Sequence, residues 1–115
     1  MAKLKFEGYQ DELLARGGTF DITGNTAVTN KQFWGFNASD GAVLAAIKGI
    51  PVNTAVTTLA EITTAEVDLA AHFLTALTDP LFAGVIYRVD GFIITSIDLT
   101  SGSLHCYKSL KQISA

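Results

Sequence analysis

Two histidines and one cysteine are the residues whose side chains could bind a metal ion or take part in catalysis: His72, His105 and Cys106. No two of these residues have the close spacing of ligand pairs in a structural zinc site, so a metal site would require distant His72 and His105 to converge in the fold. His105 and Cys106 are neighbours on a predicted strand, where adjacent side chains point to opposite faces and cannot form a catalytic dyad. We therefore expect no metal and no cofactor, and we interpret Cys106 as a small buried apolar residue.

The acidic residues have structural explanations as well. Glu66 and Asp68 are two positions apart and would not face each other on a helix. Glu66 follows Thr63 by three residues, a spacing typical of a helix capping box. Three further aspartates precede or occupy turns, as Asp commonly does: Asp21, Asp40 and Asp90. The sequence also lacks a phosphate-binding loop, a nucleophile elbow and a dinucleotide-binding motif, so we predict that the protein is not an enzyme.

The chain is weakly charged for a domain of its size. Of its 115 residues, 17% are charged and 49% are apolar, whereas ordinary soluble domains contain about 25% charged residues. With a net charge of −3 and no Lys or Arg between Lys48 and Arg88, the sequence argues against nucleic acid as a partner. A neutral surface is instead suited to burial against other protein subunits.

No segment has the character of a membrane or export signal. The longest apolar runs, such as residues 43–47, have about five residues, far short of the roughly twenty needed to cross a bilayer. The first residues, Met-Ala-Lys-Leu-Lys-Phe-Glu-Gly, show no apolar region of a signal peptide. We expect no membrane association and synthesis in the cytoplasm.

The pattern of the chain predicts a mainly β fold, a compact β-sandwich or barrel-like domain. Alternating or β-branched segments bounded by Gly, Asn and Asp indicate strands. We expect strands over residues 19–23, 26–29 and 31–36, and three more within 84–108, joined by turns at Asp90-Gly91 and Ser101-Gly102. Residues 43–47 are compatible with helix or strand, and we favour a strand because the run is short and flanked by glycines.

Two short helices are expected beside the strands, at about residues 11–16 and 64–77. The first ends at Gly17-Gly18. The second follows from the capping box and from apolar residues at helical spacing between Val67 and Leu77, before Pro80. Alternatively, residues 67–69 form a strand edge and only the remainder coils. We divide the chain into an N-terminal arm, residues 1–10, and a single β-rich domain, residues 11–115.

The same pattern suggests which residues contact other subunits. Phe33, Trp34 and Phe36 form the densest aromatic cluster, which would more often divide between core and interface than form a stacking platform for a ligand. The segment beginning at Phe92 is apolar on both faces, so either a second layer of this subunit or a neighbouring subunit must cover it. The candidate interface residues are Leu4, Phe6, Phe33, Trp34, Phe36, Phe92 and Ile94.

Taken together, these segments resemble the small virion proteins of tailed bacteriophages. The most specific part is T-S-I-x-L-T-S-G-S-L-x-x-Y at residues 95–107, and the order of the preceding Gly-rich, aromatic and Ala-rich segments agrees with it. The resemblance implies a β-rich, non-enzymatic, often trimeric protein of the virion that binds the major capsid protein lattice as a decoration (cement) or head-fibre subunit. The alternative is a tail-fibre module that binds a receptor or glycan through Trp34 and its neighbours.

Overall fold

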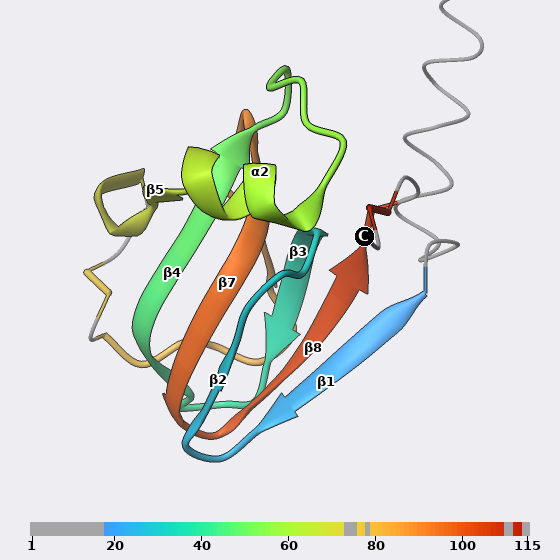
Figure 1. Cartoon of the computed structure of the whole chain (residues 1–115). Helices are drawn as coiled ribbons and strands as arrows, with labels where there is room; N and C mark the ends of the chain where they lie inside the picture. The colour runs from blue at the N-terminus through green and yellow to red at the C-terminus, as the bar shows by residue number, and fades with distance from the viewer. Residues whose placement is uncertain (1–17, 73–75, 78, 110–111, 114–115) are drawn as a thin grey trace, which may run out of the picture.

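One antiparallel sheet, curled into a half-barrel, forms the body of the molecule (Figure 1). The computed structural model describes residues 18–72, 76–77, 79–109 and 112–113. Within these residues the strands are β1 (Thr19–Thr23), β2 (Thr26–Val28), β3 (Phe33–Ala38), β4 (Val43–Pro51), β5 (Val67–Asp68), β6 (Ile86–Tyr87), β7 (Phe92–Ser101) and β8 (Ser103–Lys108). The helices are α2 (Leu59–Ala65) and the short 3₁₀ helix η1 (Ala70–His72). The prediction of a mainly β, barrel-like domain is confirmed.

The order of strands across the sheet is β1-β8-β3-β7-β4-β5. The long strand β7 pairs with β4 along one edge and with both β2 and β3 along the other, while β6 pairs with β3. At the β7–β8 turn, Gly102 has a φ of +88°, and a Cβ atom there would lie 2.7 Å from the Cβ of Ala42. The predicted turn at Ser101-Gly102 and the predicted strand at residues 43–47 are both present.

The hydrophobic core lies inside the curl of the sheet. Its fully buried side chains come from strands far apart in the sequence: Ile22, Phe33, Phe36, Leu44, Ile47, Ile94, Ile97, Leu99 and Leu104. Phe33 and Ile94 are register partners between β3 and β7, and each is 0% exposed. Phe36 is likewise 0% exposed. These three predicted interface residues are therefore core residues, because curling the sheet brings β3 over β7 within one subunit.

The predicted helix at 64–77 is wrong over most of its described part, since only residues 64–65 lie in the α-helix. The helix begins earlier, at Leu59, and ends at Ala65, and residues 67–68 form β5, as the alternative interpretation had it. The helix N-cap is Thr58, whose hydroxyl accepts a hydrogen bond from the backbone N–H of Glu61 at 3.2 Å, while the Glu61 carboxylate accepts from the Thr57 N–H at 3.2 Å. Residues 73–75 and 78 lie outside the described residues, as do the predicted arm at 1–10, with Leu4 and Phe6, and the predicted helix at 11–16.

After α2 the chain returns to the sheet as β5, close to the point where the backbones of β4 and β7 approach each other. β5 pairs with β4 through Lys48 with Asp68 and Gly49 with Val67. A Cβ atom at Gly49 would lie 2.2 Å from the carbonyl oxygen of Ile93 and 2.7 Å from Leu69 Cδ1. Glycine is therefore needed where β4, β7 and the segment after β5 meet. No helix among the described residues is both long and apolar enough to span a membrane.

Candidate functional site

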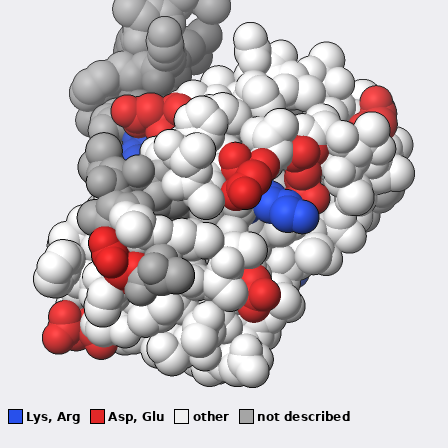
Figure 2. Space-filling view, turned by 90° about the vertical axis from the view of Figure 1, so that its left-hand side faces the viewer, with Lys and Arg blue, Asp and Glu red and all other residues white. Residues whose placement is uncertain are grey.

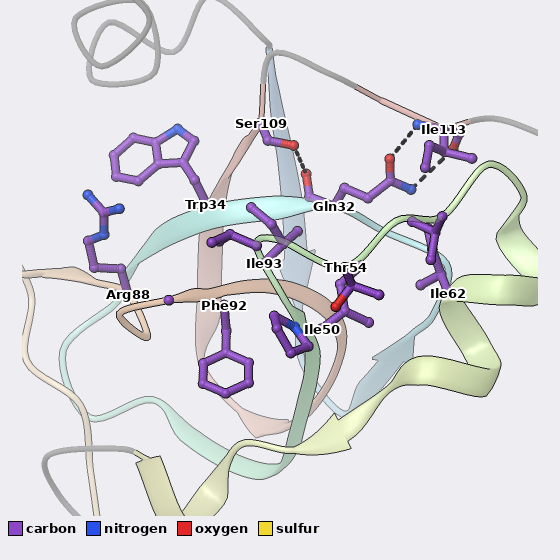
Figure 3. Close-up of a pocket in the computed structure, with 14 residues that line it drawn as sticks. Gln32, Trp34, Ile50, Thr54, Ile62, Arg88, Phe92, Ile93, Ser109 and Ile113 are labelled. Carbon is purple, nitrogen blue, oxygen red and sulfur yellow. Dashed lines mark hydrogen bonds between the residues drawn. The ribbon is translucent and has the colours of Figure 1, made fainter. Parts of the chain in front are cut away.

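A pocket of about 420 Å³ opens where the end of β4 meets the start of β7 (Figure 3). Its volume falls in the range of roughly 300–1,000 Å³ that is usual for ligand pockets. The close approach at Gly49 positions its floor, because the residues that follow Gly49 and those around Ile93 line it. We call it the Trp34 pocket; the lining residues are Gln32, Trp34, Ile50, Pro51, Val52, Thr54, Val56, Ile62, Arg88, Gly91, Phe92, Ile93, Ser109 and Ile113.

One wall of this pocket is fixed by hydrogen bonds between distant segments. The Gln32 side-chain amide donates to the carbonyl oxygen of Ile113 at 3.1 Å, and the Ile113 N–H donates back to Gln32 Oε1 (Figure 3). The Ser109 N–H donates to the carbonyl oxygen of Gln32 at 3.0 Å. On the opposite side, Ile62 of α2 is 0% exposed. The wall of the pocket is therefore held by contacts between separate elements of the fold, and not by a single loop.

Trp34 stands at the margin of the pocket with its ring covered. The ring stacks on Tyr107, with centroids 5.2 Å apart, and the Arg88 guanidinium lies over it at 5.4 Å. Trp34 is 3% exposed, so it offers no open ring face on which a sugar could stack. Its buried indole N–H has no hydrogen-bond partner among the residues that the structure describes. An unpaired buried donor is unfavourable.

Phe92, the remaining candidate interface residue, is half-buried and lines the Trp34 pocket. Its ring packs against the exposed His72, with centroids 4.9 Å apart. Trp34 and Phe92 are the two described interface candidates that line the pocket, and of these Phe92 alone is not fully buried.

A second apolar surface lies on the segment that leads into β6 and includes it. We call residues 80–87 the Phe82 loop. Its base is anchored, because the Leu81 N–H donates to the carbonyl oxygen of Ala42 at 2.8 Å and the buried Leu81 accepts from Gly41 at 2.9 Å. Beyond this anchor, the side chains of three apolar residues are largely exposed: Phe82 at 63%, Val85 at 42% and Ile86 at 47%. Clustered exposed apolar residues mark a contact surface.

Sequence reasoning did not identify the Phe82 loop. The available signal was an eight-residue run without a charged residue, Pro-Leu-Phe-Ala-Gly-Val-Ile-Tyr. From the sequence alone, such a run cannot be distinguished from the apolar segments of the core strands. The structure shows that it lies outside the core.

The potentially reactive residues are not assembled into one site. His105 Nδ1 lies 2.5 Å from Asp21 Oδ1 on the exposed face of β8 and β1, whereas His72 packs on Phe92 at the other side of the sheet. Among the described residues, no group of three His, Cys, Asp or Glu side chains is arranged to hold a metal ion. Cys106 is 0% exposed, and burial, with a further contribution from Asp21, raises its pKa to about 12. The thiol is therefore neutral and inert at physiological pH.

Glu66 has a structural role. Its Oε2 accepts hydrogen bonds from the hydroxyls of Thr95 and Ser96 on β7, which fixes the end of α2 to the sheet. Thr95 is 0% exposed, so this carboxylate satisfies a hydroxyl that would otherwise be buried without a strong acceptor.

The surface is largely uncharged. Figure 2 shows the side of β4 and β5, where white surface predominates and most charged side chains are acidic. Comparison with known proteins returns no matching family model, no matching curated protein and no matching solved structure. The resemblance to phage virion proteins therefore rests on the pattern of the sequence.

Proposed function

We propose that this chain is a non-enzymatic virion structural protein, a capsid-associated decoration (cement) or head-fibre subunit that binds the capsid surface and associates with copies of itself, most simply as a trimer. The observation that carries this proposal is the anchored Phe82 loop, which holds Phe82, Val85 and Ile86 in water. Such a surface is unfavourable in an isolated subunit and is typical of a protein–protein contact. The sequence resemblance supplies the class of partner.

The mechanism is binding alone. Burying apolar surface contributes about 25 cal/mol per Å², so a few hundred Å² contribute several kcal/mol before the entropic cost of association. Weak contacts of this size become effective when a multimeric subunit binds many equivalent capsid sites at once. A surface with few charges reduces the desolvation penalty of such contacts.

The direct test is co-sedimentation with capsids. The purified protein would be mixed with capsids assembled from the major capsid protein of the same genome and centrifuged through a density gradient. We expect it to sediment with the capsids to a fixed saturating ratio, and its peptides to be found by mass spectrometry in gradient-purified virions. A folded protein that stays at the top of the gradient and is missing from purified virions contradicts the proposal.

A further inference from the structure

We propose that Asp90 is a site of spontaneous isomerisation to isoaspartate, in the turn that leads into β7. The chain contains two Asp-Gly dipeptides, Asp40-Gly41 and Asp90-Gly91. Aspartate is most prone to this reaction when glycine follows it, because glycine has no side chain to obstruct the attack and its backbone rotates freely. The structure distinguishes the two sites. The reaction requires no partner, so it does not depend on the proposed function.

The chemistry needs only the two residues and water. The backbone nitrogen of Gly91 loses its proton and attacks the side-chain carboxyl carbon of Asp90. A C–N bond forms, the elements of one water molecule leave, and the product is a cyclic imide, a succinimide. Water then opens the ring at either carbonyl group: one opening restores aspartate, and the other leaves the chain running through the former side chain, as isoaspartate. The overall change involves no oxidation, no reduction and no change in mass.

The two Asp-Gly turns have the same local geometry. In the first, the Ala42 N–H donates to the carbonyl oxygen of Ser39 at 3.1 Å, and in the second the Phe92 N–H donates to the carbonyl oxygen of Val89 at 3.1 Å. Each glycine has a φ of +82°, as a type II turn requires at its third residue. Both dipeptides are exposed, and neither glycine has a heavy atom within 4 Å of an added Cβ. Turn shape and access of water therefore do not separate the two sites.

The turns differ in the hydrogen bond of the attacking nitrogen. The Gly41 N–H donates to the carbonyl oxygen of Leu81 at 2.9 Å, and the Leu81 N–H donates to the carbonyl oxygen of Ala42 at 2.8 Å. Attack by the Gly41 nitrogen must first break a tertiary hydrogen bond beside this second one. The Gly91 N–H, in contrast, donates to no acceptor among the described residues. The fold therefore protects Asp40 and leaves Asp90 reactive.

This difference can be expressed as a ratio of rates. A hydrogen bond of this kind contributes about 1 kcal/mol net, which corresponds to a factor of about five in rate. We therefore expect isoaspartate to accumulate at Asp90 at least about fivefold faster than at Asp40 in the folded protein.

Isomerisation would alter the start of β7. Isoaspartate adds one carbon to the main chain of the turn, in which the carbonyl oxygen of Gly91 accepts a hydrogen bond from the Val52 N–H at 2.9 Å. Pro51 and Phe92 are register partners immediately beyond this bond. A longer turn cannot keep both, so we expect the amide protons of Val52 and Phe92 to exchange faster with solvent. Ageing at Asp90 would therefore loosen the backbone that carries the interface candidate Phe92.

The test follows both sites in one sample. The protein would be incubated at physiological temperature and mildly alkaline pH, in native buffer and in denaturant, and digested with trypsin at intervals. The two sites fall in different tryptic peptides, residues 32–48 and 89–108. Chromatography separates the isoaspartate forms from the aspartate forms, and electron-transfer fragmentation locates the isomerised residue. The rate in denaturant gives the intrinsic reactivity of each dipeptide, and dividing by it isolates the effect of the fold.

Two matched variants serve as controls, Asp90→Glu and Asp40→Glu. Each keeps the negative charge at an exposed position, but the longer side chain cyclises far more slowly. Asp90→Glu should remove the isoaspartate from the peptide 89–108 and keep the Val52 amide protected throughout the incubation, as measured by hydrogen exchange. Asp40→Glu should age as the wild type does at both amides.

The inference is supported by a normalised rate at Asp90 at least about fivefold above that at Asp40. It is overturned if the normalised rates are equal or reversed, or if the folded protein forms no isoaspartate at Asp90 while the unfolded chain does. Faster exchange at Val52 in aged Asp90→Glu, to the same extent as in aged wild type, would refute the structural consequence, because the loosening would then have another cause.

Discussion

Replacing Gly49 by alanine tests whether the approach of β4 to β7 positions the candidate site. The added Cβ would lie 2.2 Å from the carbonyl oxygen of Ile93 and 2.7 Å from Leu69 Cδ1. The first contact involves backbone on both sides, so it can be relieved only by moving β4 about 1 Å away from β7, which weakens ladder hydrogen bonds of about 1 kcal/mol each. Overpacking against Leu69 costs about 1–3 kcal/mol in addition. We expect Gly49→Ala to lower the free energy of unfolding by about 3–5 kcal/mol.

The assay is urea unfolding together with a thermal melt. At about 4 °C per kcal/mol for a domain of this size, the melting temperature should fall by about 12–20 °C. The matched control is Gly24→Ala, where φ is +68° but no atom lies within 4 Å of the added Cβ. That variant carries only a conformational penalty of about 1 kcal/mol. If Gly49→Ala loses no more stability than Gly24→Ala, the steric argument is refuted, and with it our explanation of how the pocket floor is held.

Two further predictions concern the helix and the cysteine. Thr58→Ala should destabilise the protein by about 1 kcal/mol through loss of the α2 N-cap, whereas Thr63→Ala should change stability by less than about 0.5 kcal/mol; equal losses in urea unfolding would contradict the assigned cap. Since the pKa of Cys106 is raised to about 12 from 9.0, the unfolded chain releases this proton first, so stability should fall by about 1.4 kcal/mol per pH unit between pH 9 and 12. Cys106→Ala should remove that part of the slope, and a slope unchanged by the substitution would contradict the assignment.

Local sequence signals were sufficient for most of the sheet. Residues 19–23 alternate apolar and polar side chains, and the structure places Ile22 inward at 1% exposure within β1. The Ser101-Gly102 turn identified the β7–β8 hairpin because only glycine readily adopts a φ of +88° beside Ala42. Strand alternation and turn chemistry are properties of adjacent residues, so they can be recognised without knowledge of the fold.

The error in the predicted helix position shows what local sequence signals cannot decide. Thr58-x-x-Glu61 and Thr63-x-x-Glu66 have the same capping spacing, and nothing within either segment decides between them. The choice is made by tertiary contacts: Thr95 and Ser96 bind Glu66, and Gly49 pairs with Val67, which draws the chain after Ala65 into β5. A helix continuing through residue 68 would lose both sets of bonds.

The same limit applies to the candidate site, because a residue's type does not say which molecule covers it. Phe33 and Phe82 are both phenylalanines in apolar surroundings, yet the first is 0% exposed and the second 63%. The difference arises from the curl of the sheet, which pairs β3 with β7 at Ile94 but leaves Phe82 outside the core, on a loop that is anchored at Leu81 and at β6. Once that closure is known, exposure rather than aromatic density becomes the criterion for a contact surface. By this criterion Phe33, Phe36 and Ile94 are no longer interface candidates, and the Phe82 loop replaces them. Of the described candidates, the half-buried Phe92 remains accessible to a partner.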